Sequence, residues 1–316
     1  MAGRTMPEPP YGGIWNRWKA GKVIPLVGSG ASFVGRPSDV PWTAQSAFLP
    51  GGLELARFLA DEAMFPSTDP LDRDDLAKVS SYYVDALGRP ALRERLREVM
   101  NRDYQTGSLH EFIAAVPAPQ VIITTNYDTL IEQAFHAAGK PYDLVVYPAD
   151  RKDNANAILW WPHGAPTPLF KPANELDIDL EKTTVIYKMH GTIVHEAPQW
   201  DSFVITEEDY IEFLSRMTTN SAVPPLFIEH FRQRSFLFLG YSLRDWNLRV
   251  VLRNLSKSLL SRHAANGEGD ADVSPSWAIQ RNPSDLEQIL WKKRYVEIFD
   301  LLLENFVSKI RCRRDN

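Results

Sequence analysis

The sequence predicts an α/β protein with a Rossmann-like, mostly parallel sheet, helices on both faces of that sheet, and a helical insertion. Short apolar runs at residues 23–27, 121–125, 185–189 and 236–239 are typical of strands that are buried on both faces. Each run is followed by glycine or polar residues, and segments with helical spacing of apolar residues lie between the runs. Because the carboxyl ends of parallel strands meet at one edge of a sheet, where such folds bind ligands, we expect these polar segments to share one rim.

The first part of the chain contains more helix than strand. Residues 14–18 predict a short helix before the first strand, and the turn residues of segment 35–42 favour an irregular segment after it. Apolar residues then recur three or four positions apart in four segments: 53–64, 72–87, 90–103 and 108–115. These segments predict a helical insertion at about residues 53–116 within a single domain that spans residues 1–316.

The second part alternates between strands and helices. A strand is expected at residues 142–147, followed by a loop-rich stretch of short strands and connections that leads to His190. Helices are expected at 207–216, 223–234, from 243 to about 262, and at 300–311; strands are expected at 277–280 and 295–299, and a polar loop at 264–274.

Composition limits the classes of function. The chain carries 35 Lys and Arg against 40 Asp and Glu, a formal net charge of −5, so it has no whole-chain attraction to nucleic acid or to an anionic membrane. No apolar run approaches the roughly 18 residues of a membrane span and the N-terminus has no signal-peptide core, so we expect a cytoplasmic protein. The single cysteine, Cys312, excludes an internal disulfide and a cysteine-based zinc ribbon, and the histidines show no H-E-x-x-H pattern, so we expect no metal site.

The first strand runs directly into Gly28-Ser29-Gly30-Ala31-Ser32. Gly28 and Gly30 have no Cβ and can adopt positive φ, so the N–H groups of this loop can face the phosphates of a ligand. The third glycine of the dinucleotide-binding pattern G-x-G-x-x-G is replaced by Phe33. Taken alone, the segment is equally consistent with a tight strand-to-helix turn that binds no ligand.

Polar residues follow the other three strands in the same way. The second strand leads into Asn126-Tyr127-Asp128, the third into His190-Gly191, and the fourth into Gly240-Tyr241-Ser242. Each segment has a structural alternative. The asparagine and the aspartate can form an Asx turn that caps the next helix, the histidine can be an ordinary side chain in a turn, and the glycine of the last segment can serve a plain turn.

These four segments, in this order, resemble the motifs of the sirtuin superfamily over roughly residues 20–300. The segments Thr124–Asp128 and Gly240–Asp245 are most similar to the zinc-free, sirtuin-like NADases of bacterial anti-phage defence. The resemblance implies that Asn126 positions ribose and water and that His190 is the catalytic base. It implies that NAD, the substrate, is bound by Gly28, Ser29, Gly30, Ala31, Ser32, Asp128, Gly240 and Ser242. The missing four-cysteine zinc module of protein-deacylating sirtuins argues against acyl-lysine chemistry.

The chemistry of NAD cleavage suits these residue types. Nicotinamide leaves as a neutral base, so the enzyme must hold the pyrophosphate, orient the ribose and place a nucleophile rather than supply a strong acid. A histidine with a pKa near the working pH can accept a proton from water or a hydroxyl, and an asparagine amide both donates and accepts. We expect His190 to lie at a strand end with little core packing.

We therefore expect an NAD glycohydrolase that releases nicotinamide and ADP-ribose and depletes NAD in phage-infected cells. Two alternatives stay open: a zinc-free NAD-dependent protein deacylase or ADP-ribosyltransferase, and a non-catalytic sensor of NAD or ADP-ribose. The presence of both Asn126 and His190 argues against a sensor, because binding alone needs no base.

The resemblance also implies partners. Short relatives of this kind are paired with a HerA-type ATPase or an Argonaute-like protein, so we expect a homo-oligomer under the control of such a partner, with the ATPase favoured. The expected contact surfaces are the N-terminal segment around Trp15 and Trp18 and the helix at residues 300–311.

Overall fold

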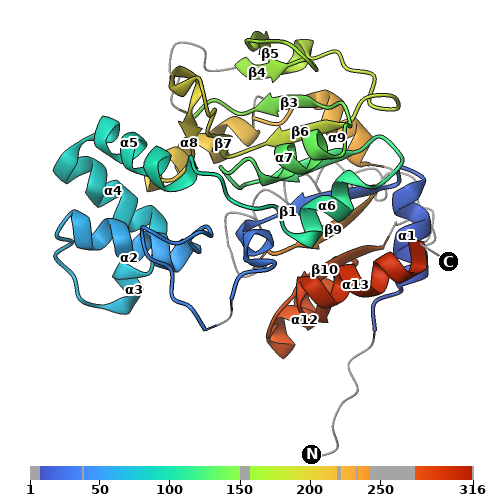
Figure 1. The fold of residues 1–316 in the computed structure, drawn as a ribbon, viewed down its shortest axis with the longest axis horizontal. Helices are drawn as coiled ribbons and strands as arrows, with labels where there is room; N and C mark the ends of the chain where they lie inside the picture. Colours follow the sequence, from blue (N-terminus) through green and yellow to red (C-terminus); the bar gives the residue numbers. More distant parts are fainter. Residues whose placement is uncertain are drawn as a thin grey trace, which may run out of the picture.

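A computed structural model describes residues 8–37, 39–149, 157–218, 222–232, 234–241 and 275–314. Its central feature is a nine-stranded sheet with the order β11-β10-β9-β1-β2-β6-β3-β4-β5 (Figure 1). The strands are β1 (Val23–Val27), β2 (Val121–Thr124), β3 (Asp143–Val146), β4 (Ala157–Trp161), β5 (Leu169–Pro172), β6 (Val185–Lys188), β9 (Ser235–Leu239), β10 (Ser276–Gln280) and β11 (Val296–Asp300). Neighbours from β11 to β3 run parallel, whereas β4 and β5 extend the sheet antiparallel. The predicted α/β fold with a mostly parallel sheet is confirmed.

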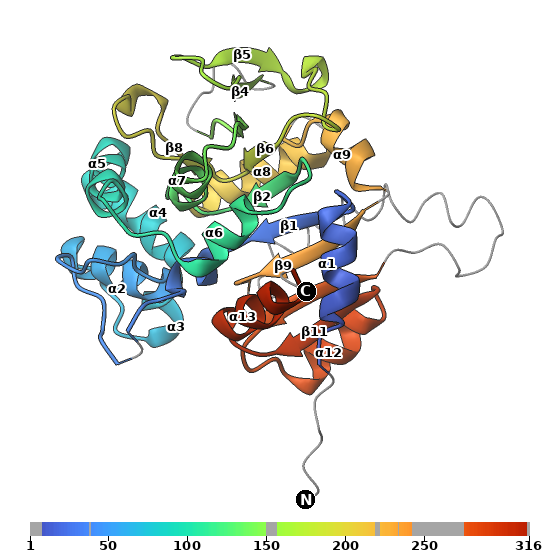
Figure 2. The ribbon, with the colours of Figure 1, turned by 45° about the vertical axis from the view of Figure 1, so that its right-hand side comes forward.

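Helices cover both faces of this sheet (Figure 2). Helices α1 (Tyr11–Lys19), α6 (Ser108–Ala114), α7 (Leu130–Ala137) and α13 (Leu303–Arg314) contribute to the core on one face, and α8 (Glu207–Thr218), α9 (Pro225–Phe231) and α12 (Asp285–Lys292) to the core on the other. Successive strand residues alternate between the two cores, as the pleat requires. In β1, for example, Ile24 and Leu26 join one core, and Val23 and Val27 join the other.

A third core belongs to a helical layer that lies beside the sheet in both ribbon views. It is formed by α2 (Gly52–Glu62), α4 (Leu76–Leu87) and α5 (Arg89–Met100), with the short α3 (Pro70–Arg73) next to α4. The helix predicted at 72–87 is divided in two because Asp75 caps α4, its carboxylate accepting from the N–H groups of Ala77 and Lys78. The assignment of residues 1–316 to one domain with an insertion at 53–116 stays a prediction.

The carboxyl ends of the central strands lie in one row. Val27 of β1 is in register with Leu239 of β9 and with Thr124 of β2, which in turn is in register with Lys188 of β6. From β1 the chain continues to β2 on one side of this pair of central strands, and from β9 it continues to β10 on the other side. Such a change of direction opens a crevice at the strand ends, which is where open α/β sheets bind ligands.

The expected exposure of the N-terminal segment around Trp15 and Trp18 is wrong, whereas the contact surfaces themselves stay a prediction. Trp18 has 0% of its surface exposed and Trp15 has 7%, and both rings contact Phe112 of α6. Trp18 Nε1 also donates to Gln120 Oε1 at 2.7 Å. Helix α13 begins at Leu303 rather than at residue 300 and packs against α1 and α6. The apolar faces of both end helices thus cover the protein's own sheet.

The remaining expectations fall on residues that are not described. Ser242, the helix predicted to follow it and the polar loop at 264–274 lie outside the described ranges. Within those ranges, none of the helices combines the length and apolar composition that a membrane-spanning helix requires.

Candidate active site

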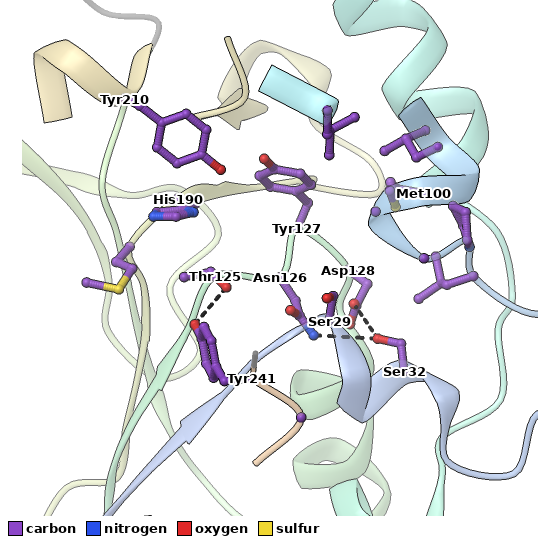
Figure 3. Close-up of a pocket in the computed structure, with 18 residues that line it drawn as sticks. Ser29, Ser32, Met100, Thr125, Asn126, Tyr127, Asp128, His190, Tyr210 and Tyr241 are labelled. Atoms are coloured by element: carbon purple, nitrogen blue, oxygen red, sulfur yellow. Dashed lines mark hydrogen bonds between the residues drawn. The ribbon is translucent and has the colours of Figure 1, made fainter. Parts of the chain in front are cut away.

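A cavity of about 300 Å³ opens at the carboxyl ends of β1, β2, β6 and β9 (Figure 3). Six of the predicted site residues line it: Ser29, Ser32, Asn126, Asp128, His190 and Gly240. Gly28 and Ala31 are buried in the same loop as the two serines but do not line the cavity, and neither does Gly30. A second cavity of about 570 Å³ shares Ser32 and Leu49 with the first, so the two adjoin. The sequence motifs thus meet at one place, and the roles assigned to their residues stay predictions.

The glycine loop differs from its expected geometry. Residues Ser29–Phe33 form a short 3₁₀ helix, and the N–H groups of Gly28 and Gly30 donate to Leu239 O and Gly240 O, both at 2.9 Å. The expectation that these two glycines use positive φ and offer free N–H groups is wrong: φ is −105° at Gly28, and the left-handed glycine of this region is Gly240, at +71°.

Close approach of two backbones explains the glycines instead. A Cβ on Gly28 or on Gly30 would lie 2.8 or 2.7 Å from Gly240 O, and one on Gly240 would lie 2.4 Å from Ala31 N. The loop after β1 and the turn after β9 can therefore contact each other only because these positions carry no side chain.

Asn126 and Asp128 connect the end of β2 to the glycine loop. Asn126 Nδ2 donates to Gly28 O at 3.1 Å and lies 3.5 Å from Ser32 Oγ. Ser32 Oγ donates to Asp128 Oδ2 at 3.2 Å, while Asp128 Oδ1 accepts from the N–H of Leu130 at 3.1 Å (Figure 3). The Asx turn that offered a structural alternative is therefore present. It uses one carboxylate oxygen and leaves the other to the serine at the cavity.

His190 is enclosed by aromatic rings. Tyr210 and Phe213 of α8 meet the imidazole nearly at right angles, with ring centroids 5.4 and 5.2 Å away. Burial lowers the pKa of His190 to about 3. Both expectations, little core packing and a pKa near the working pH, are wrong, because α8 covers the side chain. The imidazole is neutral at pH 7, so one ring nitrogen carries no proton.

The glycine after the histidine fixes this segment. Gly191 has φ +90°, and a Cβ there would lie 2.0 Å from Ser202 O. This close approach allows β7 (Gly191–Thr192) to pair with β8 (Ser202–Phe203), and His190 O accepts from the N–H of Val204 at 2.9 Å.

Two tyrosines of the motifs make contacts that the sequence did not predict. Tyr241 Oη donates to Thr125 Oγ1 at 2.7 Å, which joins the end of β9 to the end of β2 (Figure 3). Tyr127 Oη donates to Val204 O at 2.6 Å and so joins the β2 end to the segment after β8. Their place inside the motifs was the only sequence signal for these roles.

Arginines of the helical layer hold the segment that follows the histidine. On α5, Arg89 donates to Phe203 O at 2.8 Å, Arg93 to Asp201 O at 3.0 Å, and Arg97 to the Asp201 carboxylate at 2.7 Å. Residues four apart share a helix face, so the spacing of these arginines could have identified the stripe.

The irregular segment predicted at residues 35–42 is present and is anchored to α2. Glu54 accepts hydrogen bonds from the Arg36 guanidinium at 2.5 and 2.7 Å, from Trp42 N at 3.0 Å and from Gly51 N at 2.8 Å. The bond from Arg36 is the main reason that the pKa of Glu54 falls to about 2. Beyond this anchor, residues 49–52 line the cavity. In the described part of the chain, no group of three or more His, Cys, Asp or Glu side chains is arranged to hold a metal ion.

Comparison with known proteins agrees with this geometry. Residues 120–299, more than half of the chain, match the family model described as the SIR2-like domain. The chain belongs to the SIR2-like family. The match includes the strand ends that carry Asn126, His190 and Gly240, and it ends within β11.

The SIR2-like chain also resembles individual proteins. It is 29% identical over 186 residues to the NAD(+) hydrolase ThsA of Acinetobacter baumannii (strain 532279), covering 57% of this chain and 31% of that protein. It is 26% identical over 211 residues to the NAD(+) hydrolase ThsA of Enterococcus faecium, covering 65% and 37%. It is 22% identical over 313 residues to the defense-associated sirtuin 2 of Bacillus subtilis, covering 93% and 27%. The matches thus span about a third of the length of these relatives.

Among solved structures, cytosolic 5'-nucleotidase IIIB bound to cytidine aligns over 98% of this chain and 93% of its own, with 10% identity and a TM-score of 0.36. A likeness at that level carries no argument about fold or function.

Proposed function

We propose that this SIR2-like chain is an NAD glycohydrolase that cleaves NAD to nicotinamide and ADP-ribose and serves anti-phage defence by depleting NAD. One observation carries the proposal: Asn126 and His190, from neighbouring strand ends, line one cavity together with Ser29 and Ser32 of the glycine loop. The names of the similar proteins, two NAD(+) hydrolases and a defense-associated sirtuin, support it. The cavity and its neighbour lie in the size range of ligand pockets.

In this proposal, water attacks the anomeric carbon of the nicotinamide ribose as the N-glycosidic bond breaks. The bonding electrons leave with nicotinamide, which departs as a neutral base, and the water proton passes to the neutral imidazole of His190. An imidazole whose pKa is about 3 is a weak base, so proton transfer follows the departure of nicotinamide rather than driving it. The Asn126 side chain, fixed against Gly28 O, orients water and ribose hydroxyls.

Two variants test these roles. His190→Ala and Asn126→Ala are each expected to lower NAD turnover by about 10²-fold or more while NAD binding falls less. The exposed His163 and Asn174 provide matched control variants, His163→Ala and Asn174→Ala, which should turn over NAD like the wild type. Turnover within a few-fold of wild type in well-folded His190→Ala would remove this histidine from the reaction. If Asn126→Ala only unfolds the protein and leaves binding intact in the folded fraction, the asparagine is a structural cap.

The products separate this function from the alternatives. Hydrolysis gives free ADP-ribose, whereas NAD-dependent deacylation of an acylated peptide gives O-acyl-ADP-ribose. Release of nicotinamide without either product would indicate transfer of ADP-ribose to a protein.

Regulation completes the proposal: the chain forms a homo-oligomer and is controlled by a HerA-type ATPase or an Argonaute-like partner. Light scattering and NAD turnover with and without each candidate partner test this part. A monomer whose hydrolysis is fast and independent of either protein would contradict it.

A further inference from the structure

A lysine lies fully buried beneath the candidate active site. Lys188 is the last residue of β6, and its side chain has 0% of its surface exposed. The preceding strand residues Val185, Ile186 and Tyr187 are also buried, so this end of β6 is shielded from water. An ammonium group in such a place is costly unless charge and hydrogen bonds compensate it.

Three acceptors surround this ammonium. Lys188 Nζ donates to Glu132 Oε1 at 2.9 Å, to Tyr127 O at 3.3 Å and to Asp128 O. A lysine ammonium has three N–H donors, so its capacity is matched by one carboxylate and two backbone carbonyls. Glu132 is on the first turn of α7 and is itself buried, so it supplies the counter-charge from within the protein.

The two carbonyls belong to the turn that carries Asn126. Tyr127 O also accepts from the N–H of Ile193, at 3.1 Å, and that residue follows His190 by three positions. Lys188 precedes the histidine by two positions. The lysine therefore lies at the junction between the turn with the asparagine and the segment with the histidine.

Stability alone does not account for such an arrangement. A buried ion pair often contributes no more than well-packed apolar side chains of the same volume would. The two carbonyl contacts, however, fix backbone directly adjacent to Asn126, and a displacement of about 1 Å can cost about 10²-fold in rate.

We infer that Lys188 is a positioning residue: its ammonium, held by Glu132, ties the backbone of Tyr127 and Asp128 to the segment of His190 and so sets the asparagine against the histidine for NAD cleavage. This inference rests on the proposed NADase function. It concerns kcat and local order, because the lysine is buried below the cavity and does not line it.

The test compares Lys188→Met with Lys188→Met/Glu132→Leu, in which the whole ion pair becomes apolar. The single variant leaves a buried carboxylate without its partner and should be less stable. The double variant should recover thermal stability. Both should show a kcat for NAD about 10²-fold below wild type with KM changed by no more than about threefold. The control is Lys182→Met, whose lysine is 82% exposed and should leave kcat and KM unchanged.

A third variant separates the carbonyl contacts from the ion pair. Glu132→Gln retains a lysine that can reach both carbonyls. The kcat of this variant should therefore be at least tenfold higher than the kcat of Lys188→Met. An equal loss of kcat in these two variants would overturn the inference, and so would a stable double variant with the kcat of the wild type.

Hydrogen exchange supplies a readout that does not depend on turnover. Amides of segments 125–130 and 190–194 should exchange faster in the double variant, while those of β1 and β9 remain protected. If the wild type cleaves no NAD, the proposed function fails, yet this exchange pattern still decides whether the lysine orders the two segments. Unchanged exchange in both segments would overturn the positioning role.

Discussion

Lowering the pH should destabilise this protein in part through His190. A side chain at that position that does not titrate should remove this part of the loss of stability. Burial lowers the pKa of this imidazole from 6.5 to about 3. The unfolded chain therefore takes up a proton near pH 6.5, whereas the folded protein keeps the imidazole neutral down to about pH 3. Between these values the unfolded state binds more protons, so stability is fully present above pH 6.5 and falls as the pH falls.

The size of the effect follows from the pKa difference. Each pH unit below 6.5 is worth about 1.4 kcal/mol, so the His190 contribution at pH 5 is a loss of about 2 kcal/mol relative to pH 7.5. His110, which is buried, and His230, which is partly buried, also have pKa values lowered by burial, and they add losses of the same sign. His190→Gln leaves those two in place, so the difference between variant and wild type isolates one group.

Urea unfolding at pH 7.5 and at pH 5.0, followed by circular dichroism, measures both free energies of unfolding. The glutamine variant should be less stable than wild type at pH 7.5, because it loses ring contacts with Tyr210 and Phe213. Its further loss on going to pH 5.0 should be about 2 kcal/mol smaller than that of the wild type. Equal losses in the two proteins would show that the imidazole does not stay neutral in the folded state, and the account of this pocket would be wrong.

The other predictions concern residues that hold the segments around the cavity. Gly30→Val should abolish NAD binding and lower the melting temperature, because the valine Cβ would lie 2.7 Å from the backbone oxygen of Gly240, whereas a Cβ at the control position Gly12 has nothing within 4 Å, so Gly12→Ala should bind NAD normally. Calorimetry measures both affinities, and full NAD affinity in the valine variant would contradict the placement of the nucleotide. Tyr241→Phe removes the 2.7 Å hydrogen bond to Thr125 Oγ1 and should lower the free energy of unfolding by about 1 kcal/mol. Urea titration measures this difference, and an unchanged free energy of unfolding would contradict the prediction. Arg97→Met removes a donor to a buried carboxylate next to the histidine segment and should lower kcat for NAD more than it raises KM; a variant with unchanged kcat would exclude any influence of the helical layer on the reaction.

The fold could be predicted from the sequence because its strands are buried on both faces. Apolar runs such as residues 23–27 and 236–239 match strands whose side chains alternate between two cores. The antiparallel extension by β4 and β5 was less visible, since Trp160 and Trp161 are only partly buried, Leu169 and Phe170 are exposed, and both strands are short. Trp15 and Trp18 were misplaced because periodicity reveals an apolar face without saying whether another molecule or the protein's own sheet covers it.

The candidate site was predictable as a set of strand ends but not in its physical detail. The register of Val27, Thr124, Lys188 and Leu239 makes the motifs meet, and that register follows from the fold class. The pKa of His190 depends on burial by α8, whose contacting residues follow the histidine by some twenty positions.

The close approach at the glycines and the contacts of the buried lysine could not be predicted from the sequence, for the same reason. The need for glycine at positions 28 and 30 comes from the backbone of Gly240. In the sequence, Lys188 is indistinguishable from an ordinary strand residue. Its partner Glu132, on α7, is 56 positions away. Contacts between distant segments decide each of these features, and no local pattern contains them.

The central claim is that the cavity of Asn126 and His190 cleaves NAD, and the most direct test is to identify the products. Purified protein is incubated with NAD, and nicotinamide and ADP-ribose are quantified by chromatography, with His190→Ala as the blank. Nicotinamide and free ADP-ribose should form in equal amounts, at a rate that the variant reduces by about 10²-fold or more. NAD that is bound but left intact by wild-type protein, or nicotinamide released without ADP-ribose, would contradict the claim.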